Sequence, residues 1–268
     1  MNQLSNFILL TILCLACNSP SSKLDCENIK GLDKILKKGQ IILLGELHGT
    51  NEAPHYLYQM ACQALNKGHQ VSIALEFPQN DQADLEIYLA SQGTDEDKKL
   101  FLSQPLWSDE YQDGKRSIAM FNLIDRIRLL IRQGYPLNIF YMDGYGNRGR
   151  EHTMASNIIK TREQNPNNII LSLVGNFHNT IVNGSDKMGS LILKKYGKQN
   201  VVSLDQNFVD GTAWINTGNN NSGPMEINGN GSSGIGIYLH KTPTEYHGTF
   251  EMHKITHSPP AKELLRTL

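Results

Sequence analysis

The residues of this chain best suited to chemistry follow two apolar runs. Glu46 and His48 come just after residues 41–44, and His178 closes a Gly-x-x-His motif that follows residues 169–174. Continuous apolar runs rich in β-branched residues predict buried strands. The first run is also followed by Gly-x-x-His. Because open α/β sheets bind ligands at the carboxyl ends of their strands, we expect the two histidines to converge.

Two further acids occupy the same kind of position. Glu76 follows the apolar residues 73–75, and Asp143 follows residues 140–142. A charged side chain at the end of a buried strand is costly unless it is paired, hydrated in a cleft or bound to metal. Each acid alone also fits a helix N-cap, and a lone histidine is more often structural. The combination predicts one pocket at the carboxyl edge of a parallel sheet, lined by Glu46, His48, Glu76, Asp143 and His178.

These residue types support two kinds of hydrolytic chemistry. An imidazole titrates near neutral pH and can take a proton from water as a general base. Two histidines and a carboxylate can instead hold Zn²⁺, Mn²⁺ or Co²⁺ with a position open for water. The candidate metal ligands are Glu46, His48, Asp143 and His178. No serine lies in a Gly-x-Ser-x-Gly elbow, so the sequence does not indicate a serine nucleophile.

Apolar patterns along the chain predict the elements that position this pocket. Strands are expected at residues 41–44, 71–76, 137–142, 169–174, 201–204 and 235–239. Helices with one apolar face are expected at 53–67, 117–132 and 151–162. Because strands and helices alternate, we expect a single α/β domain over residues 39–268, with a central mostly parallel sheet flanked by helices. A helical insertion is expected at 81–114, after the second strand, and a flexible loop rich in Asn, Gly and Ser at 216–234.

The N-terminal residues predict export and a lipid anchor. Residues 7–16 form an apolar run that suits a signal peptide and is too short to span a bilayer as a helix. Leu15-Ala16-Cys17 resembles the end of a bacterial lipobox, which makes Cys17 the candidate lipidation site. We expect a signal peptide over 1–17, a tether and lead-in over 18–38, and a lipid-anchored protein of the bacterial envelope. A cleaved secretory signal without lipid is the alternative.

Cys26 and Cys62 remain in the mature chain. Export permits a disulfide between them. Cys62 also fits the interpretation favoured here, a small buried apolar residue beside Met60 and Ala61.

The charge balance bears on the partners. A net charge of −1 and a pI near 6.8 leave no electrostatic footprint for nucleic acid. We therefore expect a small-molecule or peptide substrate, no nucleic acid, and contact with a membrane through the anchor.

Four motifs together resemble the Tiki-like superfamily. That group includes erythromycin esterases, haem-binding ChaN-type lipoproteins and the Tiki and TraB metalloprotease-like proteins. The motifs are Leu-Gly-Glu-Leu-His-Gly-Thr at 44–50, Ala-Leu-Glu at 74–76, Arg-Glu-His-Thr-Met-Ala-Ser-Asn at 150–157 and Gly-Asn-Phe-His at 175–178. The resemblance spans roughly residues 41–180, and the C-terminal third does not take part.

The resemblance implies Glu46, His48, Glu76 and His178 as the centre of the site. In esterase-like members a histidine at the His48 position would be the general base on water. In Tiki-like members Glu46 and the two histidines would help to hold a divalent ion. Arg150, oriented by the acid that follows it, would clamp a carboxylate or stabilise an oxyanion. We therefore expect hydrolysis of an ester or amide by activated water, possible with or without a metal.

The ChaN-like branch of the resemblance implies a different function, non-enzymatic haem binding in iron uptake. Haem iron needs an axial donor such as His or Tyr beside apolar surface. Tyr141, Tyr145 and His152 are the candidates near the expected pocket. The chain has no Cys-x-x-Cys-His motif, so such a haem would be held without a covalent bond.

Overall fold

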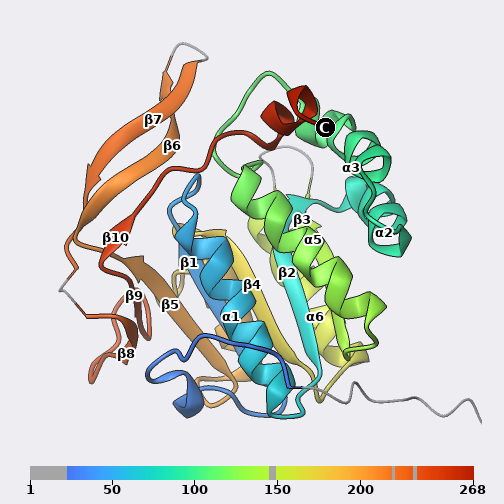
Figure 1. Cartoon of the computed structure of the whole chain (residues 1–268). Coiled ribbons are helices and arrows are strands. Elements are labelled where there is room, and N and C mark those ends of the chain that lie inside the picture. Colours follow the sequence, from blue (N-terminus) through green and yellow to red (C-terminus); the bar gives the residue numbers. More distant parts are fainter. Residues whose placement is uncertain (1–22, 145–148, 219–220, 232–233) are drawn as a thin grey trace, which may run out of the picture.

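A seven-stranded sheet forms the centre of the protein (Figure 1). The structure is a computed structural model that describes residues 23–144, 149–218, 221–231 and 234–268. The strand order is β3-β2-β4-β1-β5-β9-β8, and every pair is parallel except β8 with β9. The prediction of a mostly parallel sheet is therefore confirmed. The strands are β1 (Ile41–Glu46), β2 (Val71–Pro78), β3 (Leu137–Asp143), β4 (Ile169–Gly175), β5 (Val201–Asn207), β8 (Gly236–Leu239) and β9 (Gly248–Glu251).

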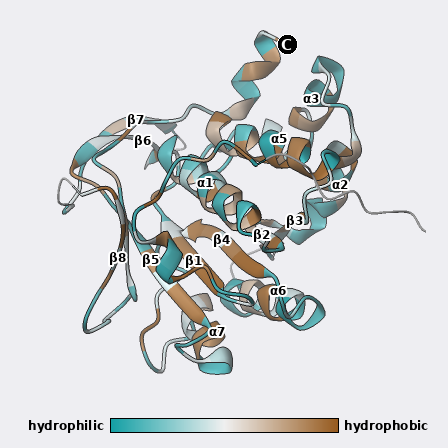
Figure 2. Cartoon of the chain, turned by 60° about the horizontal axis from the view of Figure 1, so that its bottom comes forward, coloured by the Kyte–Doolittle hydropathy of each residue, from teal (hydrophilic) through white to brown (hydrophobic). Residues whose placement is uncertain are grey.

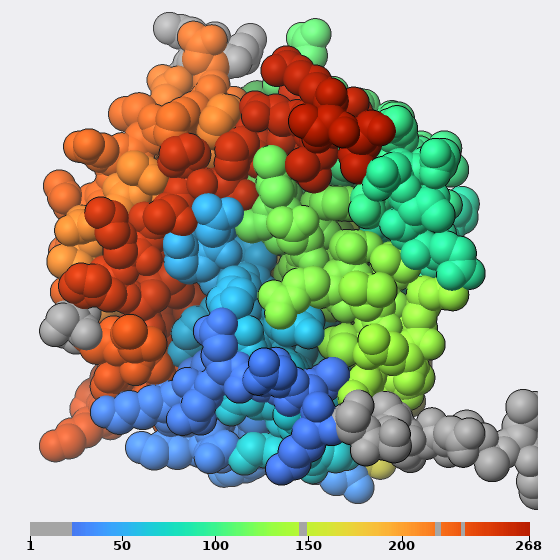
Figure 3. Space-filling model, viewed as in Figure 1, coloured from blue at the N-terminus to red at the C-terminus, as the bar shows by residue number. Residues whose placement is uncertain are grey.

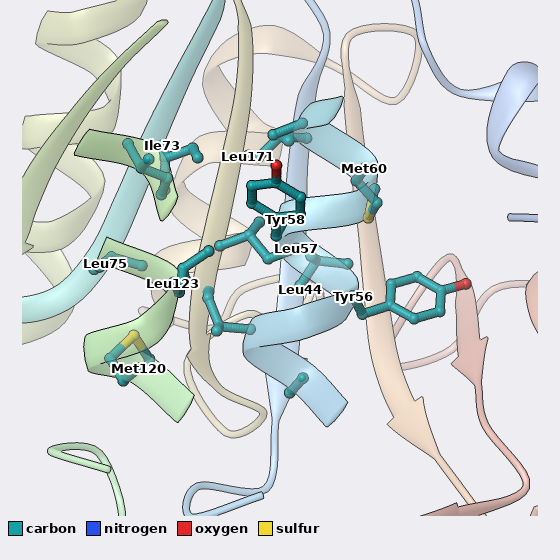
Figure 4. Close-up of a cluster of buried hydrophobic side chains, with 14 of the residues drawn as sticks. Leu44, Tyr56, Leu57, Tyr58, Met60, Ile73, Leu75, Met120, Leu123 and Leu171 are labelled. Atoms are coloured by element: carbon teal, nitrogen blue, oxygen red, sulfur yellow. The ribbon is translucent and has the colours of Figure 1, made fainter. Parts of the chain in front are cut away.

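Helices cover both faces of this sheet, which explains why the central strands are apolar throughout. Helices α1 (Glu52–Asn66) and α5 (Ile118–Arg132) pack on one face, and α6 (Arg150–Gln164) and α7 (Met188–Tyr196) pack on the other. Figure 4 shows the first face, where Leu57 of α1 and Leu123 of α5 lie near Leu44 and Leu171 of the sheet. Each such buried side chain contributes roughly 1.5–3 kcal/mol. In Figure 2 the central strands are brown, and the surfaces of the helices turned away from them are mostly teal.

The expected helical insertion is present between β2 and β3. It contains α2 (Gln82–Ala90), α3 (Asp95–Leu102) and the short α4 (Pro105–Ser108), which precede α5. Tyr88 stacks on Phe101 with ring centroids 4.4 Å apart, and Trp107 lies 5.5 Å from Phe77 of β2. These aromatic contacts fix the insertion against the end of β2. The loop that leaves it towards α5 carries Lys115.

The prediction of a flexible loop over residues 216–234 is wrong for residues 216–218 and 221–228, which lie in strands. A second sheet, β10-β6-β7, contains β6 (Asp210–Gly218), β7 (Asn221–Asn228) and β10 (Lys254–Ile255). β6 and β7 pair antiparallel and rise beside the carboxyl end of β1 (Figure 1). The Trp214 N–H of β6 donates to the Gly49 carbonyl at 2.9 Å, which docks the ribbon on the loop after β1. Backbone pairing thus outweighs an Asn- and Gly-rich composition.

The segment before β1 packs on the domain. Cys26 and Cys62 form a disulfide, so the favoured interpretation of Cys62 as an unpaired core residue is wrong, although its side chain is fully buried. Ile29 and Leu32 are buried, and the segment covers the lower part of the surface in Figure 3 (blue). The fold therefore includes most of the expected lead-in. Short 3-10 helices lie at η1 (Leu32–Lys34), η2 (Gln79–Asp81) and η3 (Ala261–Arg266).

The disulfide indicates a protein outside the cytoplasm, because thiols are kept reduced in the cytosol. The expected signal peptide and Cys17 lie outside the described residues. Among the residues that are described, no helix combines the length and the apolar character needed to cross a membrane.

Candidate active site

The loop after β1 folds back so that His48 meets Glu46. Glu46 is the last residue of β1, and its side chain is only 3% exposed. Gly49 has a φ of +78°, and a Cβ there would lie 2.1 Å from the Trp214 carbonyl oxygen, so glycine is required. The turn brings His48 Nδ1 to 2.9 Å from Glu46 Oε1. The Nδ1 proton is thereby directed to the carboxylate, and Nε2 faces the other way.

Glu76 is the centre of the site. It lies near the end of β2, is buried, and accepts the Gly175 N–H at 2.7 Å on Oε2. His48 Nε2 lies 3.5 Å from Oε2, and His178 Nε2 lies 3.7 Å from Oε1. The two imidazoles predicted to converge therefore face one carboxylate. Their side chains are 22% and 15% exposed, so water reaches both.

Two cations contact the same oxygen of Glu76 that lies nearest His178. Arg150 Nη2 and Lys115 Nζ lie 2.8 Å and 3.3 Å from Glu76 Oε1. Arg150 begins α6, and its Nε also donates to both oxygens of Asp143 at 3.0 Å. Lys115 is further paired with Asp113 at 3.5 Å. Asp143 thus orients Arg150, because a guanidinium binds a carboxylate through two parallel donors.

The second histidine is held in the same way as the first. His178 Nδ1 lies 2.8 Å from Glu151 Oε1 of α6. Glu151 also accepts the Met188 N–H at 2.9 Å on Oε2 and lies 3.3 Å from Lys187 Nζ. The expectation that Glu151 orients Arg150 is therefore wrong, because its carboxylate faces His178. Phe177, which is 64% exposed, places its ring under the Lys187 ammonium.

The charges of the site are strongly coupled. Burial alone would lower the pKa of His48, but the negative charges of Glu76 and Glu46 outweigh it and raise the pKa from 6.5 to about 10. Burial alone would raise the pKa of Glu76, but His48 and Lys115 hold it well below 4.5. Glu76 also raises the pKa of Lys115 against its burial. At neutral pH the site therefore contains an ionised Glu76 surrounded by cations.

The sequence identified most of this constellation, and the structure brings together Glu46, His48, Glu76, Asp143, Arg150 and His178. The sequence contains no indication of Lys115, because this residue lies in a polar loop with no motif around it. It also missed Lys187, since a lysine before an apolar helix carries no functional signal. The role of Glu151 beside His178 could have been inferred only from a pairing between α6 and the loop after β4.

The expected metal site does not fit this geometry. Over the described part of the chain, no three His, Cys, Asp or Glu side chains are arranged to hold a metal ion. Asp143, one of the expected ligands, is bound to Arg150. A divalent ion beside Glu76 would also be repelled by Arg150 and Lys115.

The haem donors do not form a common pocket among the described residues. Tyr145 lies outside them. His152 is exposed on α6. Tyr141 is buried against Phe77, with ring centroids 5.0 Å apart, and burial raises its pKa. Haem binding therefore stays a prediction from the sequence resemblance.

Comparisons with known proteins give matches at the level of structure. No family model and no curated protein sequence matches the chain. A succinoglycan biosynthesis protein matches with a TM-score of 0.62 at 10% identity, over 86% of this chain and 91% of that one. An erythromycin esterase, the H289N mutant of EreC in its open conformation, matches with a TM-score of 0.56 at 11% identity, over 87% and 90% of the two chains.

A haem-binding ChaN of Campylobacter jejuni matches more distantly, with a TM-score of 0.37 at 11% identity over 74% of this chain and 90% of that one. The two stronger matches, at 10% and 11% identity, show the fold. The chain therefore has the fold of the erythromycin esterase and its structural relatives.

Proposed function

We propose that this protein hydrolyses an ester or amide bond by general acid–base catalysis on water. One observation carries the proposal. His48 and His178 are each held through Nδ1 by a separate carboxylate, and both present Nε2 to the region of Glu76. A histidine held in this way has a fixed tautomer and ring orientation, which general acid–base catalysis requires.

The two imidazoles have different roles. His48, with a pKa of about 10, carries a proton at neutral pH and acts as the general acid. His178 is the general base: its Nδ1–H donates to Glu151, which leaves the Nε2 lone pair to accept a proton from water. Lys187 and the Met188 N–H share the charge of Glu151. This assignment gives His48 a role different from the base expected from the resemblance.

The cations of the site suit the charge that develops on the substrate. Water attack on a carbonyl carbon produces an oxyanion, and fixed positive groups stabilise it. Arg150 and Lys115 converge on one oxygen of Glu76 and are held by Asp143 and Asp113. His48 then donates its proton to the leaving oxygen or nitrogen. By its name, the structural relative EreC acts on an ester, which supports this class of reaction but does not extend its substrate to this chain.

The test is a turnover screen with p-nitrophenyl esters and anilides of different acyl groups. We expect hydrolysis by the wild type and a loss of about 10²–10⁴-fold in His178→Ala, the usual range for a general base. His253→Ala is the matched control, because His253 is exposed on the loop between β9 and β10. Full activity in His178→Ala would eliminate the proposed base.

We further propose that the protein is anchored in the bacterial envelope through a lipid on Cys17. The lipobox-like sequence supports this location, and the disulfide agrees with export. Cys17→Ser should move the protein from the membrane fraction to the soluble fraction on cell fractionation. A variant that stays in the membrane fraction would contradict the anchor.

A further inference from the structure

A groove on the far side of the molecule from the β6–β7 ribbon runs along β3. β3 is the last strand on this side of the seven-stranded sheet, and no other described strand pairs with its outer edge. It lies between α2 and α6 (Figure 2). The cavity has a volume of about 610 Å³ and is lined by both helices and by the strand itself. This groove contains none of the residues of the candidate active site.

The strand directs backbone N–H and carbonyl groups to this groove, and one of them, the Tyr141 N–H, is already bonded to the side chain of Gln82. The Val71 N–H of β2 donates to the Pro136 carbonyl at 3.0 Å, and in a parallel ladder the bonding residues then alternate. Residues 138, 140 and 142 therefore face β2. Ile139 and Tyr141 direct their N–H and carbonyl groups outwards. The Tyr141 N–H confirms this direction, because it donates at 2.8 Å to the side chain of Gln82 on α2.

The shape of the groove selects the kind of partner. A row of outward N–H and carbonyl groups is a template for another extended backbone. The helices flank the strand on both sides, so the edge of a second folded sheet, including β3 of another copy, would collide with them. A single extended segment is thin enough to enter. Five residues of a strand span about 17 Å, which matches the part of β3 that lines the cavity.

The two walls differ in chemistry. Leu89 and Ala90 of α2 and Ile131 of α5 line one side, where Glu86 is also present and is hydrogen-bonded to Gln82. The α6 side is polar, with Asn157, Lys160 and Gln164. Because successive side chains of a strand point to opposite faces, an entering segment would place alternate residues against each wall. Lys160 favours an acidic residue on the polar side.

We propose that this groove binds an extended peptide segment that pairs with β3 and alternates apolar residues with polar or acidic ones. The apolar residues face Leu89, Ala90 and Ile131, and an acidic residue faces Lys160. The proposal does not depend on the hydrolytic activity proposed above, because the groove shares no residue with that site.

The probe is the acetylated and amidated heptapeptide Ile-Asp-Val-Thr-Val-Asp-Ile, titrated into the full chain by calorimetry or fluorescence anisotropy. Two N-methylated versions separate backbone pairing from simple adhesion. One is methylated on the apolar residues and the other on the polar residues, and these sets direct their N–H groups to opposite edges. We expect one version to bind at least tenfold more weakly and the other to bind like the parent. Equal binding by both versions, strong or weak, would overturn the proposal.

Two substitutions test the walls. Ala90→Trp fills the groove from an exposed position and should weaken binding at least tenfold. Lys160→Glu should weaken binding of the acidic peptide and strengthen binding of a version with Lys in place of both Asp residues. Lys194→Glu, which changes an exposed residue of α7, is the control and should alter the binding of neither peptide. Circular dichroism melting verifies that each variant is folded.

Hydrogen exchange of the wild type gives an independent readout. The Ile139 amide should exchange more slowly with the peptide present. Absence of binding at about 1 mM peptide, where even weak sites of millimolar Kd are half-filled, would also overturn the proposal.

Discussion

Replacing Glu76 with glutamine tests the electrostatic account of the site. The pKa of His48 rises from 6.5 to about 10, which corresponds to a preference of about 5 kcal/mol for the charged imidazole at 1.36 kcal/mol per pKa unit. Glu76 is the largest favourable cause of that rise. In Glu76→Gln, Glu46 is the carboxylate that remains beside the His48 imidazole. We expect the pKa of His48 to fall by at least one unit, roughly 1.4 kcal/mol or more.

The same substitution should lower stability. Arg150 and Lys115 lose a buried anionic partner, although Asp143 and Asp113 still contact them. Removal of one member of a buried ion network costs about 3–5 kcal/mol, and we expect the lower end because those pairs remain.

The assay is an NMR titration of the imidazole signals, with urea unfolding at neutral pH for the free energy. Glu163→Gln is the control, since Glu163 is an exposed carboxylate on α6 that pairs with Lys195. A His48 pKa that stays near 10 in Glu76→Gln would refute the coupling inferred here.

Other predictions concern pH, the disulfide and the loop after β1. Because the folded pKa of His48 lies above its unfolded value, its stabilisation is fully present below pH 6.5 and is lost as the pH rises towards about 10, so urea midpoints should fall over that interval. Cys62→Ala removes a cross-link between positions 36 residues apart, so urea unfolding should show a free energy of unfolding lower by about 4 kcal/mol. Reduction of the wild-type disulfide should lower it by a similar amount. Gly49→Ala should lower the free energy of unfolding by about 1–3 kcal/mol, because φ at this position is +78° and the new Cβ meets a backbone carbonyl. A thermal midpoint equal to that of the wild type would contradict this.

The sequence predicted the elements that carry the strongest local signal. The short apolar runs before Glu46 and before the motif of His178 are rich in β-branched residues, which indicates buried strands, and their parallel pairing follows from the helices between them. The acids after these strands were recognisable because charge at the end of a buried run needs a reason. The site was therefore predictable wherever a functional residue ends a strand.

The remaining parts depend on contacts between distant segments. Lys115 reaches Glu76 because the insertion packs Trp107 against Phe77, a tertiary contact with no local pattern. The sequence indicates a loop for the end of β6 and all of β7, because the stability of this ribbon comes from cross-strand pairing and from Trp214, which docks on Gly49. The disulfide between Cys26 and Cys62 likewise depends on how the segment before β1 packs on α1, which has no local sequence signal.

A double-mutant cycle on His48 and His178 tests the central claim most directly. Steady-state hydrolysis of the best ester from the screen would be measured for the wild type, His48→Ala, His178→Ala and the double variant. If the two imidazoles serve one acid–base step, each single change lowers kcat by about 10²–10⁴-fold. The kcat of the double variant should then lie no more than about tenfold below that of the less active single variant, because the effects of groups that act as a unit are not additive. Wild-type kcat in either single variant, or losses that simply multiply, would contradict the proposed mechanism.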